Sequence, residues 1–236
     1  MIGTLINVGT ILAGSGIGVS IGSRLPERMR ETVLQGLGLL TFLVGMQMAL
    51  ETKNILVVLG AILMGGILGE ILHIHDGLQS LGQFLQARLS KGSGIGHSSR
   101  FAEGFVTASL VFCVGPMAIL GSIQDGLSGD FRLLTVKSVL DGFASIAFSA
   151  SLGWGVSLSV VSILLYQGCI TLFASQLSKI LTDPMVVEMT ATGGLIILGI
   201  SLKLLNLSEI RLANFLPALA IAPFIIVITP IIRSFF

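Results

Sequence analysis

Charged side chains are scarce in this sequence. Only 11% of its 236 residues are Asp, Glu, Lys or Arg, whereas 53% are hydrophobic. A soluble globular domain carries about 25% charged residues, so this composition excludes an ordinary soluble protein. The 13 basic and 12 acidic residues nearly cancel, giving a formal net charge of +1. A net charge this close to zero gives no reason to expect an acidic binding partner. Without a basic patch interleaved with aromatic residues, we expect no binding to nucleic acid either.

Cysteines and catalytic motifs are also rare. The two cysteines, Cys113 and Cys169, both fall within apolar segments, where we expect reduced, packed side chains rather than a disulfide. The sequence contains no CxxC pair, no HExxH motif and no phosphate-binding Walker loop. His73 and His75 lie two residues apart, a spacing that does not place both on one helix face. Nothing therefore indicates an enzyme, a cofactor or a bound metal.

Long apolar segments are what the sequence has in abundance. Runs of about 17–25 residues recur along it, the length that an α-helix needs to cross a hydrocarbon core of roughly 30 Å. We therefore predict an all-α, polytopic bundle of transmembrane helices in a lipid bilayer, with about eight spans. The first run lacks a charged n-region and a convincing cleavage site, so we expect it to be retained. The predicted spans are 2–22, 34–50, 55–74, 102–122, 133–152, 155–177, 190–205 and 212–232.

The predicted spans divide the chain into four parts. Residues 1–90 form a first helical repeat that ends in an amphipathic helix at the membrane surface. Residues 91–100 are expected to be a flexible linker. Residues 101–153 form a central hairpin with a broken helix, and residues 154–236 form a second helical repeat.

Basic residues predict the orientation of the chain. They gather in the loop after the first span and in the linker after the third: Arg24, Arg28, Arg30, Arg88, Lys91 and Arg100. Cytoplasmic loops carry an excess of Lys and Arg, so both regions are expected inside the cell. Both termini are then outside the plasma membrane.

Small residues at four-residue spacing mark two of the spans. Such a ridge lets another helix backbone approach closely, which is the usual basis of tight packing in lipid. The two ridges are Gly14, Gly18 and Gly22 in the first span, and Ala61, Gly65 and Gly69 in the third.

The two ends of the chain resemble each other. A gapless alignment of spans two and seven pairs Glu31 with Glu188 and Gly36 with Gly193. Spans one to three then correspond to spans six to eight, five helices later, and this odd offset inverts the second copy. Many transporters use an inverted repeat to build alternating access around a site at the membrane midplane. The alternative is chance similarity between apolar segments.

Ionisable residues inside the spans are candidates for function, since each costs about 2.5–3.5 kcal/mol at the membrane centre. Lys137 and Asp141 lie at positions i and i+4 of span five, so they share a helix face and can pair, with Ser138 beside them. One interpretation is a substrate or ion site, in which Asp141 binds a cation and Lys137 binds an anion or responds to protons. The other is a pair that only holds the central helices together, with Lys137 reaching towards the interface.

Neutral groups extend this candidate site. Gly115 and Pro116 interrupt span four, and they predict either a simple kink or a discontinuous helix whose free ends face a solute. Asn7 in span one and Gln167 in span six are candidates for solute contact or for hydrogen bonds between helices. A secondary group follows the break and is interpreted as a solvated loop or as a cation entry site: Gln124, Asp125 and Asp130.

These residues and their surroundings resemble the YdfK/YqgA-type family of bacterial inner-membrane proteins, a family defined by a domain of unknown function. The resemblance covers nearly the whole length of the chain. It implies a multi-pass protein of the bacterial plasma membrane, for which transport is the suggested role, and it supplies no substrate. It rests on Asn7 with the glycine-rich first span, SRLPERMR at 23–30, LVFCVGPMAILGSIQDGLSGD at 110–130, KSVLDG at 137–142, Gln167, and TGGLIILG at 192–199.

We therefore predict a transporter or channel for a small solute or ion. A homodimer is expected, because so few helices rarely enclose a pathway alone. The alternative is a membrane scaffold or accessory subunit that transports nothing.

Overall fold

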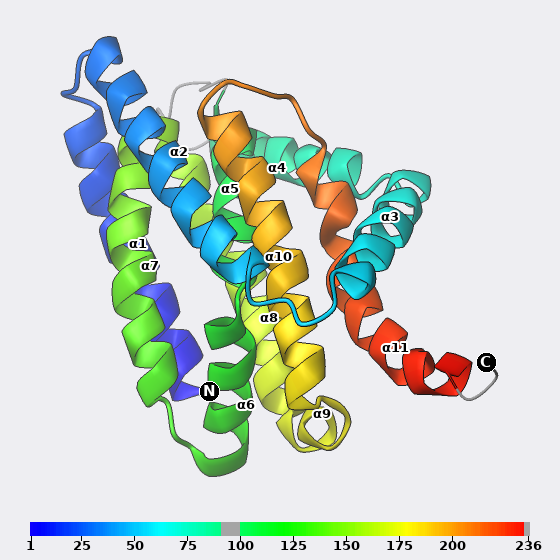
Figure 1. Cartoon of the computed structure of the whole chain (residues 1–236). Coiled ribbons are helices and arrows are strands. Elements are labelled where there is room, and N and C mark those ends of the chain that lie inside the picture. The colour runs from blue at the N-terminus through cyan, green and yellow to red at the C-terminus, as the bar shows by residue number, and fades with distance from the viewer. Residues whose placement is uncertain (91–99, 234–236) are drawn as a thin grey trace. The chain divides into compact units, whose positions relative to one another are not determined.

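The computed structural model describes residues 1–90 and 100–233. All regular structure in those residues is helical (Figure 1), which confirms the predicted all-α class. The predicted linker, 91–100, lies outside the described residues except for its last position. The elements are α1 (Ile2–Gly22), α2 (Glu27–Ala49), α3 (Ile55–Ile71), α4 (Ile74–Ser90), α5 (Phe101–Cys113), α6 (Pro116–Ser128), α7 (Arg132–Leu152), η1 (Gly153–Leu158), α8 (Ser159–Leu172), α9 (Ala174–Ile180), α10 (Asp183–Leu204), η2 (Leu212–Phe215) and α11 (Leu216–Arg233).

The described helices provide four candidate membrane spans, or up to six when two bent helix pairs each count as one. The four are α1, α2, the run Arg132–Leu172 and α10. The predicted count of eight is not confirmed. Predicted spans five and six are joined through η1 into one run of 41 residues, and span four is divided into two helices of 13 residues. A helix of 13 residues is about 20 Å long, too short to cross a bilayer alone.

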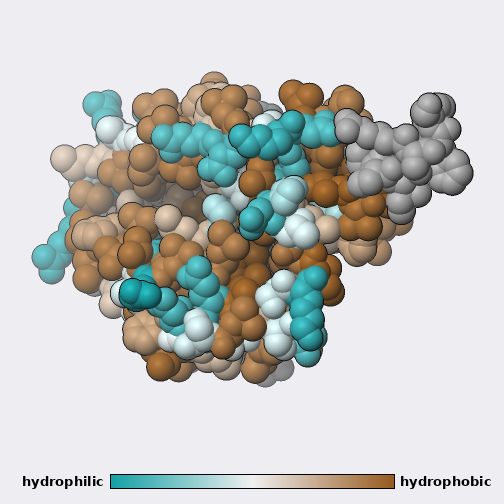
Figure 2. Space-filling model, turned by 60° about the horizontal axis from the view of Figure 1, so that its bottom comes forward, coloured by the Kyte–Doolittle hydropathy of each residue, from teal (hydrophilic) through white to brown (hydrophobic). Residues whose placement is uncertain are grey.

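Large hydrophobic side chains are exposed along many of these helices. On α3, for example, Leu59, Leu63 and Ile67 are all more than half exposed. Figure 2 shows hydrophobic residues over much of the visible face, with hydrophilic residues gathered in patches. Such a surface is unfavourable in water and favourable against lipid tails, so it indicates that these helices lie in a membrane.

The chain forms two compact units that alternate along the sequence. Unit 1 comprises residues 1–37, 76–113 and 117–177. Unit 2 comprises residues 38–75, 114–116 and those from 178 onward. Helix α2 therefore contributes its first part to one unit and its second part to the other. The predicted four-part division of the chain stays a prediction.

The core of unit 1 is built on α1 and α7, which lie side by side and run in the same direction (Figure 1). The predicted ridge of α1 is the reason that they can approach so closely. A Cβ atom on Gly14 would overlap the carbonyl of Gly142, and one on Gly22 would overlap the carbonyl of Ala150. Gly18 faces the carbonyl of Ile146 in the same way. The ridge is thus confirmed as a backbone-to-backbone contact.

Helices α5, α6 and α8 of unit 1 run in the opposite direction to α1 and α7. Phe101, at the start of α5, touches Gly155 in η1, next to the end of α7. Gly126, near the end of α6, touches Thr171 near the end of α8. The α5–α6 pair and α8 therefore both lead away from η1, and the chain reverses between α7 and α8.

Unit 2 holds two antiparallel helix pairs. In the first, the second half of α2 packs against α10, where Gly45 and Gly194 let the two backbones meet. In the second, α3 packs against α11 and η2. The predicted ridge of α3 is confirmed there, since Gly65 lies against the backbone of Ala218 and Gly69 against the backbone of Asn214. Ala61 is fully buried in the same cluster.

Candidate functional site

Lys137 and Asp141 lie one turn apart on α7, inside unit 1. They are only 6% and 8% exposed, although both are ionisable. The ammonium group of Lys137 donates to Oδ2 of Asp141. The predicted i, i+4 pair is therefore confirmed, and it is buried in the unit rather than reaching towards an interface.

Asn7 joins this pair from α1. Its Nδ2 group donates to Oδ2 of Asp141 at 3.0 Å, so one carboxylate oxygen accepts from two helices. The parallel packing of α1 on α7 explains the meeting, because Gly3 lies beside Leu134 and Gly14 lies beside Gly142. Asn7 falls between these two contacts and so faces the Lys137–Asp141 turn. We call Asn7, Lys137 and Asp141 the buried cluster.

The buried cluster contains a polar atom that is not satisfied. Asn7 is fully buried, and its Oδ1 has no hydrogen-bond partner among the described residues. Thr4, one turn earlier on the same face of α1, is also fully buried, and within the described chain its hydroxyl oxygen is unpartnered too. A buried acceptor without a donor costs about 1–3 kcal/mol, so such an atom calls for a water, an ion or a solute. The buried cluster therefore keeps a hydrogen-bond acceptor without a donor among the described residues.

Ser138 lies next to Lys137 but uses its proton locally. It is fully buried, and its hydroxyl donates to the carbonyl of Leu134 at 2.6 Å, one turn back on α7. The hydroxyl oxygen can still accept a hydrogen bond, but its proton is engaged within the helix. Of the polar residues predicted on α7, Asp141 is the one for which the described residues show a hydrogen bond to another helix, from Asn7 of α1.

Gln167 lies on α8, which packs against both α1 and α5. The residue is fully buried, and neither atom of its amide has a hydrogen-bond partner in the part of the chain that the structure describes. No contact places it in the buried cluster. Burying an amide whose two polar atoms make no hydrogen bond is unfavourable in free energy. Gln167 stays a candidate for solute contact, and its alternative role in hydrogen bonding between helices also stays a prediction.

The Gly115-Pro116 motif separates two helices rather than kinking one. Helix α5 ends at Cys113, α6 begins at Pro116, and the two are bent by 63°. Gly115 has a φ of +150°, which a residue with a side chain rarely adopts. The prediction of a discontinuous helix is confirmed, whereas that of a simple kink is wrong. Helix α5 packs against α7, the helix that carries Lys137 and Asp141.

Asp125 corrects the interpretation of Gln124, Asp125 and Asp130 as a solvated loop. Helix α6 continues through Gly126 to Ser128, so Asp125 lies on a helix face and is only 5% exposed. Its Oδ2 accepts from the backbone N–H of Gly3 at 3.1 Å and from the amino group of Met1 at 2.9 Å. Asp125 therefore caps the start of α1, where a negative charge is favourable. Gly121 and Gly126 favoured a turn in sequence but serve close packing instead, whereas Gly129 has a φ of +70° in the loop after α6.

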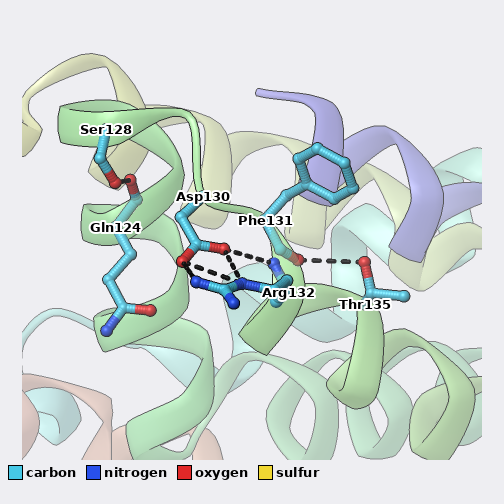
Figure 3. A network of polar contacts seen from close by, with 6 residues as sticks. All are labelled: Gln124, Ser128, Asp130, Phe131, Arg132 and Thr135. Carbon is cyan, nitrogen blue, oxygen red and sulfur yellow. Dashed lines mark hydrogen bonds and ion pairs between the residues drawn. The ribbon is translucent and has the colours of Figure 1, made fainter.

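Asp130 is a partner of Arg132 at the surface (Figure 3). Both oxygens of its carboxylate accept from the guanidinium, at 2.6 to 3.2 Å, and one also accepts the backbone N–H of Arg132. These bonds lower the pKa of Asp130 from 3.8 to about 2. Gln124 is exposed, and its side chain points away from this pair in Figure 3. Asp125 is therefore buried, whereas Gln124 and Asp130 lie at the surface.

Glu188 is a buried carboxylate that sequence reasoning did not select. It lies near the start of α10 in unit 2 and is only 3% exposed. Its oxygens accept from Oγ1 of Thr52 at 2.7 Å and from the backbone N–H groups of Lys53 and Asn54 at 2.8 and 2.9 Å. Glu188 thus clamps the turn between α2 and α3. Its position inside an apolar segment was the available signal.

A second polar contact in unit 2 joins the end of α3 to the start of η2. Glu70 accepts from Arg211 at 2.6 Å and from Nδ2 of Asn214 at 2.5 Å. Asn214 in turn accepts the backbone N–H of His75 at 2.7 Å. Glu70 and Arg211 are both more than half exposed, which is typical of a structural surface contact rather than of a site.

Comparison with known proteins confirms the family resemblance seen in the sequence. The family described as "Protein of unknown function (DUF554)" matches residues 2–227. The chain is 30% identical over 230 residues, 96% of each sequence, to "Uncharacterized membrane protein YdfK" of Bacillus subtilis (strain 168). It is 28% identical over 229 residues, 94% of each sequence, to "Uncharacterized protein YqgA" of Escherichia coli (strain K12). No solved structure matches the chain.

Proposed function

The chain belongs to the DUF554 family of proteins of unknown function, and we propose that it is a membrane transporter or channel for a small solute or ion. The apolar helices and the name of the Bacillus subtilis relative both indicate a membrane protein. We place the chain in the bacterial plasma membrane with both termini outside, since Arg24, Arg28 and Arg30 then lie in a cytoplasmic loop.

The observation that carries this proposal is the buried cluster. Removing a lysine and a carboxylate from water costs several kcal/mol per ion in real proteins. The attraction between the two charges offsets only part of this cost. Ionisable residues inside membrane helices are functional candidates for that reason. Asn7 adds a buried oxygen without a partner among the described residues, beside Asp141. Helix α5, which ends at the Gly115-Pro116 break, packs against α7, and broken helices of this kind line many transport sites.

An inverted architecture with eight passes is part of the proposal. The α2–α10 and α3–α11 pairs of unit 2 are antiparallel, as two hairpins related by an axis in the membrane plane would be. The reversal between α7 and α8 supports counting these helices as separate passes. One detail speaks against a close repeat. Glu31 is exposed in unit 1, whereas the residue aligned with it, Glu188, is buried in unit 2.

We propose a homodimer as the working form, since a bundle of this size encloses little space by itself. Native mass spectrometry of the protein extracted from membranes measures this directly. A dimer that persists in lipid nanodiscs supports the proposal, and a strict monomer that transports solute would contradict it.

A scaffold or accessory subunit is the second candidate. It is favoured by the fact that Lys137, Asp141 and Asn7 bond to one another and so tie α1 to α7. Proteoliposomes distinguish the two candidates. Purified protein is reconstituted, and the flux of small inorganic ions, amino acids and organic acids is compared with that of empty liposomes. A transporter moves at least one class faster. A scaffold moves none, and it copurifies with a defined protein partner.

A further inference from the structure

A groove opens at the surface of unit 2 between α3 and the segment that leads into η2. Its volume is about 390 Å³, within the range of about 300–1,000 Å³ that is usual for small-molecule pockets. Leu63 and Ile67 of α3 line it, together with Ile210 and Phe215 of the other segment. Nearly all of the accessible lining is apolar. A groove of this kind holds an apolar group rather than water.

Gly66 lets the two sides of the groove meet. A Cβ atom built on Gly66 would lie 2.8 Å from the ring of Phe215, so the ring can lie directly on α3. Leu63 and Ile67 stand before and after Gly66 on the helix and are 56% and 64% exposed. These exposed side chains provide the apolar surface that a lipid chain could cover.

The groove has charged residues at one end. Glu70 lies one turn after Ile67 on α3, and the guanidinium of Arg211 donates to it at 2.6 Å. Ile62, which also lines the groove, lies eight positions before Glu70, or about 12 Å along the helix. The groove therefore has a charged end and an apolar end.

Glu70 and Arg211 can each receive a third partner. Both are more than half exposed, so they form no buried solute site, and an exposed pair of this kind contributes little to stability. The guanidinium has five N–H donors, and its hydrogen bond to Glu70 uses one of them. Nδ2 of Asn214 also donates to Glu70, at 2.5 Å, and so holds the carboxylate at the end of the groove.

The charged end lies where the membrane surface is expected. Helix α3 ends at Ile71, next to Glu70, and the chain bends by 56° into α4. The sequence of α4 has the amphipathic pattern of a helix that lies on the membrane surface. The charged end is then level with the lipid head groups, and the apolar end lies deeper among the lipid tails.

We propose that this groove binds one phospholipid whose head group carries both a phosphate and a primary ammonium, as in phosphatidylethanolamine. Arg211 donates to the phosphate, and the ammonium donates to Glu70. One acyl chain lies along Leu63, Ile67 and Phe215. A purely anionic head group would leave the carboxylate without a second cation, and a choline head group has no N–H to donate. The proposal requires a membrane protein but no transport activity, so it stands apart from the proposed function.

Native mass spectrometry of the purified full-length protein resolves lipids bound one at a time. Delipidated protein in detergent is titrated with dioleoyl phosphatidylethanolamine, phosphatidylglycerol and phosphatidylcholine, and the apparent Kd of the first bound lipid is compared. The affinity for phosphatidylethanolamine should exceed that for the other two by about tenfold, the fold-change expected for one hydrogen bond to a charged group.

Two charge variants test recognition of the head group. Arg211→Gln removes the cation that binds phosphate, so the affinity for all three lipids should fall. Glu70→Gln leaves Arg211 without an acidic partner, so the preference should change to the anionic phosphatidylglycerol. Arg132→Gln is the matched control, because it removes the arginine of the exposed pair with Asp130 in unit 1. That control should bind lipids as the wild type does.

A third variant tests the groove itself. Ile67→Trp fills the groove and keeps both charges, so the affinity for all three lipids should fall while their order stays the same. Leu59→Trp is its control, since Leu59 is 53% exposed on the same helix and is not among the residues that line the groove. All variants are compared as monodisperse peaks in size-exclusion chromatography.

Equal affinity of the wild type for the three lipids would overturn this inference. So would Arg211→Gln that binds phosphatidylethanolamine like the wild type, or Glu70→Gln that keeps the original preference. If Ile67→Trp leaves lipid binding unchanged but dissociates a dimer, the groove is an interface between two copies and the inference is wrong. Flux in the proteoliposome panel decides separately whether the proposed transport function stands.

Discussion

Asn7 and Asp141 are 134 positions apart in the sequence, and their side chains meet at 3.0 Å between two parallel helices. Local helix spacing cannot bring together two residues that lie this far apart in the sequence. The glycine ridge of α1 brings the two backbones close enough for a short amide to reach a carboxylate. The same packing that stabilises unit 1 therefore creates its most unusual polar contact.

Removing the Asn7 amide should lower stability. Asn7→Leu has a similar size but cannot donate to Asp141, and a hydrogen bond to a charged group contributes about 1.5–3 kcal/mol. We expect a lower unfolding midpoint in detergent, measured by thermal denaturation. Leu5→Ala is the control, because Leu5 is 63% exposed on the same helix. Equal midpoints for Asn7→Leu and the wild type would mean that this bond contributes nothing.

A methyl group on the glycine ridge should push α1 and α7 apart. At Gly18 it would overlap the carbonyl of Ile146, and overpacking of this kind costs about 1–3 kcal/mol. Gly16 is the matched control, since no described atom lies within 4 Å of a Cβ built there. Gly16→Ala should be neutral or stabilising, as alanine favours helix over glycine by up to about 1 kcal/mol. If both alanine variants melt at the same temperature, the ridge is not a close contact.

Glu188→Gln should loosen the turn between α2 and α3. The variant loses a charged acceptor for two backbone N–H groups and places an amide donor among other donors. Hydrogen exchange should accelerate at Lys53 and Asn54 and should change little in α7. Glu31→Gln changes the exposed glutamate that aligns with Glu188. That variant should leave exchange at the turn unaltered, and acceleration there in both variants would contradict the clamp.

Asp130 should remain ionised in moderate acid. Its pKa is lowered from 3.8 to about 2 because Arg132 donates to both carboxylate oxygens. The carboxylate form is therefore favoured by folding, and this contribution is complete above pH 3.8 and fades as the pH falls through about 2. The pair is exposed, so its effect on stability is small. Carboxyl NMR titration should show Arg132→Gln returning Asp130 towards its ordinary pKa, and an unchanged titration would refute the pairing.

Local spacing predicted much of this molecule. The i, i+4 relation of Lys137 and Asp141 sets their pairing, because both lie on one helix. The small-residue ridges followed from the same periodicity, and the helix break followed from Gly115 and Pro116. In each case the information needed lies within a few residues of the feature.

Features that depend on packing between distant helices were not predictable in the same way. Gly121 and Gly126, on either side of Asp125, indicated a turn, whereas they let α6 pack closely on its neighbours, which buries the carboxylate. Glu188 finds its donors in a turn 134–136 residues away. The number of spans was not confirmed, because hydropathy cannot show how far a broken helix bends.

The most direct test of the account is solute flux through Asp141→Asn in proteoliposomes, compared with Asp130→Asn. Both variants remove one carboxylate, but Asp141 is buried beside Lys137 and Asn7, whereas Asp130 pairs with Arg132 at the surface. We predict that Asp141→Asn, reconstituted as a folded protein, loses the flux of whichever ion or solute the wild type carries, while Asp130→Asn keeps it. Wild-type flux through Asp141→Asn would contradict the central claim.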